Sequence, residues 1–430
     1  MASPPVALSS ASSATSHVRW KVSLLLLVLT LINFADRGVL GAVAPVLTEA
    51  FHLSQSQYGL IAAGFSIGYA PVCFFSGFIV NALGPRRTYK WFVSLWSLAI
   101  AAFAGAWGFV SLLMLRIAFG TSEATVFACG SQLIGKWLPG QERGRSSALM
   151  TVGIPLGAFI VVPLTVWLTH LFGWQVPFIF LGAMGFVWLL VAMPIITDIP
   201  QGNRRVSKSE LEVIGTGSAG EHSVGSAGPV PWGRILRSKT LWLTGLAFMS
   251  SAYCLYFMMH YFPTYLVKQR HVEYTSLALL ATVPWLAMAI GTLVSGVVSD
   301  KIYAWSGGNL RWARSYLGGG CLVLTGALIA VSIGMTSTTE IVILLSIASG
   351  INFVVQPIFF AIPIDATPEF AGAAEGMTVG IGALGGVFAP MVTGFLVDYT
   401  GNFVVAFSVV AALPILFGLL VVFWVHPDRL

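Results

Sequence analysis

Charged residues are scarce in this sequence. Asp, Glu, Lys and Arg together make up 9% of its 430 residues, whereas hydrophobic residues make up 57% and the mean hydropathy is +0.85. A soluble globular protein carries roughly 25% charged residues. The composition therefore excludes an ordinary soluble domain and indicates a protein that crosses a lipid bilayer several times.

Cysteine is also scarce, and catalytic motifs are absent. The four cysteines, Cys73, Cys129, Cys254 and Cys321, lie in apolar segments without the spacing of metal ligands. We therefore expect no disulfide, no metal site and no cofactor. The glycine-rich stretch 380–386 lies inside an apolar run rather than between a strand and a helix, which excludes a phosphate loop. We expect no enzymatic activity.

The basic residues form no separate patch, although the net charge is +6. They lie between the apolar runs, so we expect no binding of nucleic acid. Residues 1–18 contain no Lys or Arg and are rich in Ser, Ala and Pro, and Arg19 and Lys21 lead directly into a full-length apolar run. This pattern differs from that of a signal peptide. We expect residues 1–18 to form a disordered cytosolic tail.

Twelve apolar runs are long enough to span a membrane. A run of about 20 apolar residues crosses the ~30 Å hydrocarbon core as a helix. The runs are 20–46, 57–81, 88–108, 110–136, 145–170, 174–196, 240–267, 275–299, 313–334, 339–364, 370–397 and 402–425. The sequence therefore predicts an all-α membrane protein with twelve transmembrane helices.

One long polar stretch, 197–239, divides these runs into two sets of six. We predict two pseudo-symmetric six-helix bundles, 19–196 and 240–426, joined by a cytosolic loop in which Ser209–Ile214 forms a short surface helix. Matched glycine positions in the two halves and the six-plus-six arrangement are typical of a duplicated transporter.

The distribution of Lys and Arg predicts the orientation. Most of the 22 basic residues fall in the terminal segments and the even-numbered connections, whereas Lys268 and Arg270 fall on the other side. Because basic loops stay in the cytosol, both termini are expected to be cytosolic, in the inner (plasma) membrane. The basic residues on the expected cytosolic side include Arg86, Arg87, Lys90, Lys136, Arg143, Arg145, Arg204, Arg205, Lys208, Lys301, Arg311 and Arg314.

Four charged residues lie inside membrane spans. Asp36 and Arg37 are adjacent in the first span, and Arg116 and Glu123 lie two helical turns apart, on one face of the fourth. A charge at the bilayer centre costs at least ~2.5–3.5 kcal/mol on insertion scales, so such residues usually serve a pathway. They indicate a binding site for a charged solute with a carboxylate that carries a proton. The alternative is a structural ion-pair network between the two spans.

Uncharged polar residues in the second half are further candidates. Tyr253, Tyr256 and His260 in span seven suit either aromatic packing or contact with a solute, and His260 also suits a proton relay. Asn352 and Gln356 in span ten suit substrate contact or hydrogen bonding between helices equally well.

The connection after the second span resembles a known motif. Residues 77–87 read Gly-Phe-Ile-Val-Asn-Ala-Leu-Gly-Pro-Arg-Arg, similar to the G-x-x-x-D-x-x-G-R-[RK] signature of the major facilitator superfamily. Asn81 replaces the usual acid, whereas the second half keeps it as Asp300. In that superfamily these residues hold the cytosolic helix ends together, so the resemblance implies gating roles for Asn81, Arg86, Arg87 and Asp300.

A second resemblance is more specific. Arg116 to Glu123, taken together with Asn33-Phe-Ala-Asp36-Arg37, resembles the anion:cation symporter family, whose members import organic anions with protons or sodium. The resemblance implies that Asp36 and Glu123 are candidate protonation sites and that Arg37 and Arg116 are partners of the substrate anion or of those acids. It also implies that Tyr69 lines the cavity. We favour protons over sodium as the coupling ion.

Span eleven departs from the pattern of sugar-acid carriers in that family. These often have asparagines there, whereas this chain has Thr378 within a run of glycines and apolar residues. We therefore expect proton-coupled import of a small organic anion, a carboxylate or sulfonate, by a monomer in the lipid bilayer. A sugar-acid symporter, an organic-anion exporter or exchanger, and a non-transporting membrane receptor remain as alternatives.

Overall fold

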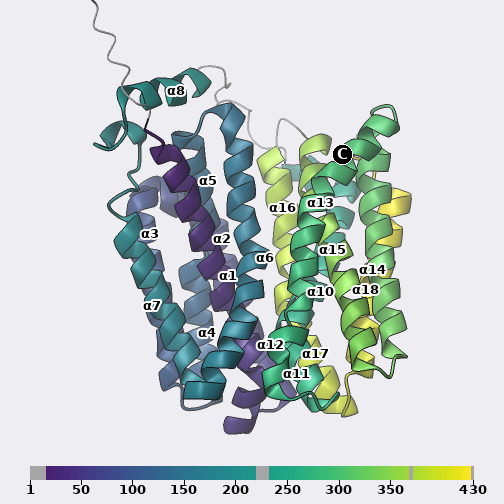
Figure 1. Ribbon diagram of the computed structural model, residues 1–430. Coiled ribbons are helices and arrows are strands. Elements are labelled where there is room, and N and C mark those ends of the chain that lie inside the picture. The colour runs from purple at the N-terminus through teal and green to yellow at the C-terminus, as the bar shows by residue number, and fades with distance from the viewer. Residues whose placement is uncertain (1–15, 219–231, 368–370, 428–430) are drawn as a thin grey trace, which may run out of the picture.

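The computed structural model describes residues 16–218, 232–367 and 371–427. These residues form helices joined by short connections, and no strand occurs among them. Figure 1 shows the membrane helices as two groups that stand side by side, the first running from α1 to α7 and the second from α10 to α18. The helix α8 lies across one end of the first group.

Each half contains six membrane-crossing elements, and some of these consist of two helices. The first half comprises α1 (Val18–Ala50), α2 (Gln55–Leu83), α3 (Pro85–Ala102), α4 (Phe109–Glu123), α5 (Val126–Trp137), α6 (Gly140–Phe172) and α7 (Gln175–Ala192). The connection contains α8 (Lys208–Ser218) and α9 (Trp232–Ile235). The second half comprises α10 (Lys239–His260), α11 (Phe262–Lys268), α12 (Leu277–Leu280), α13 (Val283–Trp305), α14 (Leu317–Ile333), α15 (Thr338–Ala366), α16 (Ala371–Ala383), α17 (Gly385–Thr400) and α18 (Val404–Trp424).

Eleven helical segments in the described part of the chain are long and apolar enough to cross a membrane. The predicted third span, which corresponds to α3, is not among them, because Arg86, Arg87 and Lys90 lie in its first two turns. It nevertheless packs against α7 and α4, beside the other spans. With α3 as the twelfth element, the all-α fold class predicted from the sequence is confirmed.

Four predicted continuous spans, the fourth, seventh, eighth and eleventh, are each divided into two helices, and the breaks in the fourth and seventh carry polar residues. The fourth span ends its first helix at Glu123 and resumes at Val126, and the seventh ends α10 at His260 and resumes at Phe262. Pro263 explains the second break, since proline has no N–H to continue the helical hydrogen bonds. Glu123 and His260 therefore lie at helix ends.

Helix α1 is enclosed at the centre of the first half. A Cβ atom on Gly157 of α6 would lie 2.2 Å from the carbonyl oxygen of Leu31, so only glycine permits this close approach. From Ile32 to Pro45, α1 is buried on every side. This packing takes Asp36 and Arg37 out of contact with lipid.

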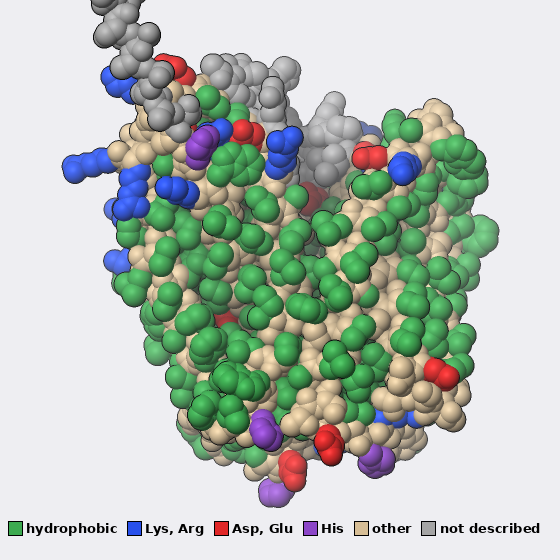
Figure 2. Space-filling model, in the orientation of Figure 1, with side chains coloured by type: hydrophobic (Ala, Val, Ile, Leu, Met, Phe, Trp, Pro, Cys, Tyr) green, Lys and Arg blue, Asp and Glu red, His purple; other side chains and the backbone are tan. Residues whose placement is uncertain are grey.

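The two ends of the molecule differ in charge. Figure 2 shows Lys and Arg side chains gathered at the end where α8 lies, and His, Asp and Glu side chains at the other. We call the first the basic end; it contains the start of α1, the α2–α3 connection and α8. We call the other the distal end.

The two halves are joined at the distal end by a set of hydrogen bonds that we call the distal clamp. Asp398 of α17 accepts the backbone N–H groups of Gln55 and Ser56 at the start of α2, at 2.8 and 2.7 Å. The hydroxyl of Tyr261 lies 2.9 Å from the carbonyl oxygen of Gln55 and 3.1 Å from that of Pro390. The start of α2 is thus held by residues of the second half.

Toward the basic end, the first two helices have exposed faces. Phe74 and Phe78 of α2 are 76% and 74% exposed, and Leu24 of α1 is 57% exposed. The same two helices contact the second half closely near the distal end, where Gly59 meets the carbonyl of Pro390. The contact between the halves is therefore concentrated at the distal end.

Glu210 of α8 joins the connection between the halves to the start of α1. Its carboxylate accepts the backbone N–H groups of Val18 and Arg19, at 3.1 and 3.0 Å, and the hydroxyl of Ser16. Arg19 in turn pairs with Glu142 of α6 at 2.8 Å. Burial raises the pKa of Glu210, but these hydrogen bonds outweigh it and hold the pKa below its usual value.

The helix predicted at Ser209–Ile214 lies within α8. The predicted domain limits (1–18, 19–196, 197–239 and 240–426) stay predictions. Parts of the predicted tail and loop, 1–15 and 219–231, lie outside the described residues.

We predict that Glu210→Gln lowers thermal stability at pH 7, because hydrogen bonds to a charged group contribute about 1.5–3 kcal/mol each. Since folding lowers the pKa of Glu210, this contribution is complete above the pKa of the unfolded chain and disappears as the pH falls through the folded-state pKa. Thermal unfolding of the purified proteins at several pH values measures the difference. Glu49→Gln, an exposed change on the same helix as Val18, is the control, and equal melting of Glu210→Gln and wild type at pH 7 would contradict the assignment.

Candidate functional site

An ion pair lies at the centre of the first half. Nε of Arg37 on α1 is 2.8 Å from Oε2 of Glu123 at the end of α4, and the two side chains are 6% and 0% exposed. The second carboxylate oxygen, Oε1, has no hydrogen-bond partner. A charge-assisted bond in so dry a place is strong, and losing either partner leaves the other charge uncompensated.

Aromatic rings surround the Arg37 guanidinium. Its central carbon lies 4.6 Å from the ring centroids of Phe34 and Phe65 and 5.0 Å from that of Tyr69. The guanidinium of Arg116 lies 5.2 Å from the same Phe65 ring. Phe65 therefore contacts both arginines, and the ring faces offset part of the cost of taking two cations out of water.

Arg116 has no acidic partner at ion-pair distance among the residues that the structure describes. It is 1% exposed, and one terminal nitrogen donates to the carbonyl oxygen of Arg37 at 3.4 Å. Its Nε and other terminal nitrogen have no partner. A buried guanidinium with two unused donor groups is suited to receive a carboxylate or sulfonate.

Asp36 occupies a different place from Arg37, although the two are adjacent in the sequence. It is fully buried, and neither carboxylate oxygen has a hydrogen-bond partner. The indole of Trp96 on α3 is one of its polar neighbours, and the indole Nε1 is also without a partner. An ionised carboxylate without a donor is costly in such surroundings, so the geometry suits the protonated form.

Asn33 belongs to the same cluster and was given no role from the sequence. It lies one helical turn before Arg37, is fully buried, and neither atom of its amide group has a partner. Its amide faces Glu123. The spacing of four residues from Arg37 was the available signal, since residues four apart share a helix face.

The second half contributes aromatic residues to the cluster. Tyr256 of α10 is an electrostatic neighbour of both Arg37 and Arg116. Its ring stacks on His260 at 6.1 Å between centroids, and His260 meets the ring of Tyr58 on α2 at 6.4 Å. His260 is fully buried, and neither ring nitrogen has a partner. The site therefore lies between the halves, directly beside the distal clamp.

Three predicted contact residues instead form bonds within the second half. Asn352 and Gln356 of α15 donate to the backbone oxygen and the hydroxyl of Ser251, each at 3.1 Å. The hydroxyl of Thr378 donates to the carbonyl of Glu375 at 3.0 Å. For the two amides, this geometry favours the alternative role of joining helices, and their contact with a substrate stays a prediction.

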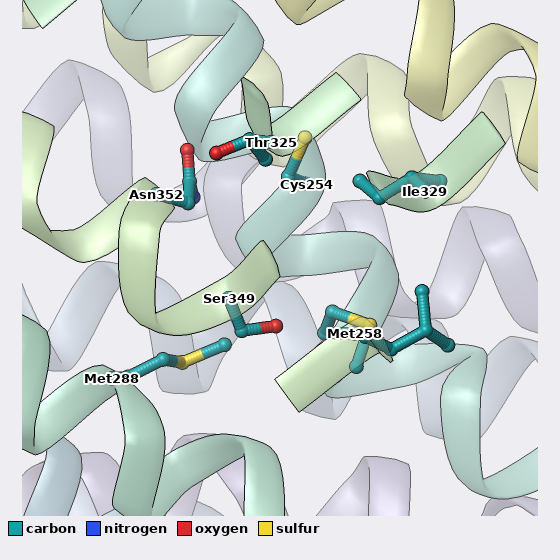
Figure 3. A pocket seen from close by; sticks show the side chains of 8 residues that line it. Cys254, Met258, Met288, Thr325, Ile329, Ser349 and Asn352 are labelled. Carbon is teal, nitrogen blue, oxygen red and sulfur yellow. The ribbon is translucent and has the colours of Figure 1, made fainter. Parts of the chain in front are cut away.

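Asn352 also lines a small cavity inside the second half, with Ser349, Thr325, Cys254 and Met258 (Figure 3). Its Oδ1 has no partner there. The cavity has room for one water molecule, which would satisfy this oxygen. Such a space is too small for an organic anion.

Tyr253, also predicted to contact the substrate, lies on α10 with 3% of its surface exposed, and its hydroxyl has no partner. Its electrostatic neighbours include Thr393 of α17 and Cys254. The described contacts of Tyr253 do not include the arginines, whereas Tyr69 and Tyr256 lie beside them.

The predicted gating residues of the first half contact that half. Asn81 accepts the side-chain amide of Gln132 at 2.6 Å. The backbone N–H of Arg86 donates to Asp198 at 2.8 Å, and its guanidinium donates to the carbonyl of Met193 at 3.1 Å. These bonds fasten the α2–α3 connection to the ends of α5 and α7.

In the second half, Asp300 is exposed and lies within α13, which continues to Trp305. It forms no hydrogen bond or ion pair with a residue that the structure describes. The neighbouring ion pair is Arg314 with Asp365 at 2.9 Å, and Arg314 also donates to the hydroxyl of Ser299 at 2.6 Å. Gating roles for Asn81, Arg86, Arg87 and Asp300 stay predictions.

Two six-helix groups around a buried cluster of charges define a membrane transporter of a well-known class. Residues 26–390 match the Major Facilitator Superfamily, and the chain belongs to that superfamily. The prediction from the sequence is confirmed, and the members it resembles are transporters rather than enzymes.

The relatives have informative names. The chain is 30% identical over 408 residues to the hexuronate transporter of Bacillus subtilis (strain 168), covering 94% of each chain. It is 29% identical to the probable sulfoacetate transporter SauU of Cupriavidus necator, over 89% of this chain and 88% of the other. A crystal structure of a bacterial homolog of the human lysosomal transporter Spinster shares the fold, with a TM-score of 0.77, 18% identity and coverage of 97% and 99% of the two chains.

We predict that Arg116→Lys weakens anion affinity about ten-fold, since a lysine cannot reproduce the planar fork of donors. Arg37→Lys should also weaken it, because an ammonium in place of the Arg37 guanidinium offers the anion no planar fork of donors. Competition by glucuronate and sulfoacetate against uptake measures both effects. Arg270→Lys, a change at the distal end outside the cluster, is the control. Wild-type affinity in Arg116→Lys would move the anion site away from this residue.

Proposed function

We propose that the protein is a secondary active transporter that imports a small organic anion together with protons. The observation that carries the proposal is Arg116, a fully buried cation with two unused donor groups, beside the Arg37–Glu123 ion pair and between the halves. The names of the relatives support an organic acid as substrate, since hexuronate carries a carboxylate and sulfoacetate carries a carboxylate and a sulfonate.

The anion binds first to Arg116. The carboxylate or sulfonate accepts hydrogen bonds from the free guanidinium nitrogens, and Phe65 shields it from the centre of the first half. Tyr256 and His260 reach the same space from the second half. A substrate held there contacts both halves, which is the condition for its binding to affect their relative position.

Proton coupling uses the Arg37–Glu123 pair. A proton that binds to the Glu123 carboxylate makes it neutral and weakens its bond to Arg37, whose guanidinium is then free for the anion. The positive charge of Arg37 is thereby compensated by the substrate instead of by Glu123. Asp36, without a partner, is the second protonation site. Neutral carboxyls lower the cost of closing a dry site around the anion.

The basic end faces the cytosol under this proposal, because positively charged connections stay inside. The structure then corresponds to a state that the distal clamp closes toward the outside. Loading from outside requires Asp398 to release Gln55 and Ser56. The protein works as a monomer in the plasma (inner) membrane, with protons as the coupling ion.

The second candidate is a sugar-acid symporter, and the hexuronate transporters among the relatives favour it. The described polar atoms argue for a smaller anion. Asn352, Gln356 and Thr378 donate to their own half, so these three side chains have fewer groups left to match the hydroxyls of a six-carbon chain. A site that satisfies many hydroxyls needs one polar partner for each.

Glu123→Gln should abolish accumulation driven by a proton gradient, because glutamine resembles the protonated acid and cannot release a proton. Exchange of internal for external substrate should survive. Uptake into proteoliposomes with and without an imposed gradient separates these outcomes. Glu340→Gln, outside the site at the start of α15, is the control. Gradient-driven accumulation at the wild-type level in Glu123→Gln would exclude this residue as the coupling site.

Competition uptake distinguishes the two substrate classes. We predict that short carboxylates and sulfonates such as sulfoacetate inhibit more strongly than glucuronate or galactonate, because Asn352, Gln356 and Thr378 are bonded within their own half and are less able to match the extra hydroxyls. Strong inhibition by the six-carbon acids and none by the short ones would establish the sugar-acid assignment instead. Failure of every organic anion to bind or exchange would contradict the transport proposal itself.

A further inference from the structure

A groove on the outer surface of the first half combines two cations with an apolar wall. It lies between α3 and α7 at the basic end and is lined by Arg86, Lys90, Ser94, Phe186, Leu190 and Met193, among others. Figure 2 shows Lys and Arg side chains along this edge of the molecule, over α3 and α7. Nothing in the transport cycle described above uses this groove.

The cations follow one stripe of α3. Arg86, Lys90 and Ser94 are spaced four residues apart, so they lie along one face of the helix. Lys90 therefore lies one turn deeper than Arg86, at about 6 Å along the axis. Together with Arg87, these two charges explain why α3 is less apolar than the eleven helical segments that are long and apolar enough to cross a membrane. A charged side chain at this depth is expected to interact with a polar or anionic group at the membrane interface.

The two cations are available for such a partner. Lys90 is exposed and forms no ion pair with any residue described, and its ammonium lies 5.8 Å from the ring of Trp91. Arg86 donates to the carbonyl of Met193, which leaves further guanidinium donors free. The nearby carboxylate of Asp198 accepts the backbone N–H of Arg86 and forms no salt bridge with either side chain.

The opposite wall of the groove is apolar and faces outward. Phe186 is 42% exposed and Leu190 is 76% exposed, and both lie on the α7 face that continues into the membrane. A soluble anion would leave this wall uncovered. A lipid, by contrast, would place its phosphate at Arg86 and Lys90 and an acyl chain along Phe186 and Leu190.

We propose that this groove binds one anionic phospholipid, with Arg86 and Lys90 holding its headgroup and α7 holding an acyl chain. Basic pockets between membrane helices on the cytosolic side are suited to anionic headgroups, and each basic residue near the surface contributes about a five-fold gain in affinity. Because Arg86 also bonds to the end of α7, the bound lipid braces the α2–α3 connection against α7.

Native mass spectrometry of the purified full-length protein tests the proposal, with phosphatidylglycerol and phosphatidylcholine of identical acyl chains as probes. Wild type should retain phosphatidylglycerol preferentially. The double variant R86Q/K90Q should lose retention about 25-fold, the product of two five-fold effects. The single variant K90Q, which leaves the bond from Arg86 to Met193 intact, should lose about five-fold. K301Q is the matched control, since Lys301 is exposed at the same end on α13 and should have no effect.

A second arm separates a lipid from a free anion. Leu190→Asn should reduce retention of long-chain phosphatidylglycerol and leave binding of its dihexanoyl form unchanged. Inorganic phosphate should give no thermal stabilisation that R86Q/K90Q removes. Equal retention of phosphatidylcholine, unchanged retention in R86Q/K90Q, or stabilisation by phosphate alone would each overturn the proposal.

Discussion

The arrangement of the first half depends on the ion pair between Arg37 and Glu123. In a low-dielectric interior the attraction between them is large, but the desolvation cost of each ion is large as well. Enclosure of α1 by its neighbours, the aromatic rings around Arg37 and the helix end at Glu123 all serve to keep this pair dry. Protonation of Glu123 would therefore change the electrostatic energy of the whole buried centre rather than that of one side chain.

Arg116 and Asp36 are two further buried charged residues near that ion pair. One is a buried cation that lacks an acid and the other a buried acid that lacks a donor, and both lie within the same packed helices. Each is energetically unfavourable alone, since burying a charged or polar group without a partner costs free energy. Under the proposed function, an anion at Arg116 and a proton at Asp36 compensate both groups together, beside an ion pair whose second carboxylate oxygen also lacks a partner.

The membrane class, the spans and the four charged residues within them could be predicted from the sequence, because apolar runs and the charges inside them are visible along the chain. The superfamily was predicted from the resemblance of short motifs, such as residues 77–87, to those of a known family. The sequence did not predict which arginine is paired, since that depends on how α1 and α4 are rotated against each other. For Asn352 and Gln356 the sequence left substrate contact and hydrogen bonding between helices equally open, and the structure has both bonded to Ser251. Buried amides satisfy themselves with whichever helix is nearest, and sequence position does not reveal that neighbour. Asn33 received no role from the sequence, because the feature that distinguishes it, a buried amide without a hydrogen-bond partner, is visible only in the structure.

The distal clamp limits what a comparison of related sequences can reveal about the contact between the halves. Asp398 binds main-chain N–H groups, and Tyr261 binds main-chain oxygens. Every amino acid except proline offers the same N–H, so the backbone hydrogen bonds of the clamp do not depend on which side chains stand at positions 55 and 56. Correlated substitutions would therefore not reveal these backbone hydrogen bonds. This contact between the halves is made largely through backbone groups, and it becomes visible only in the folded structure.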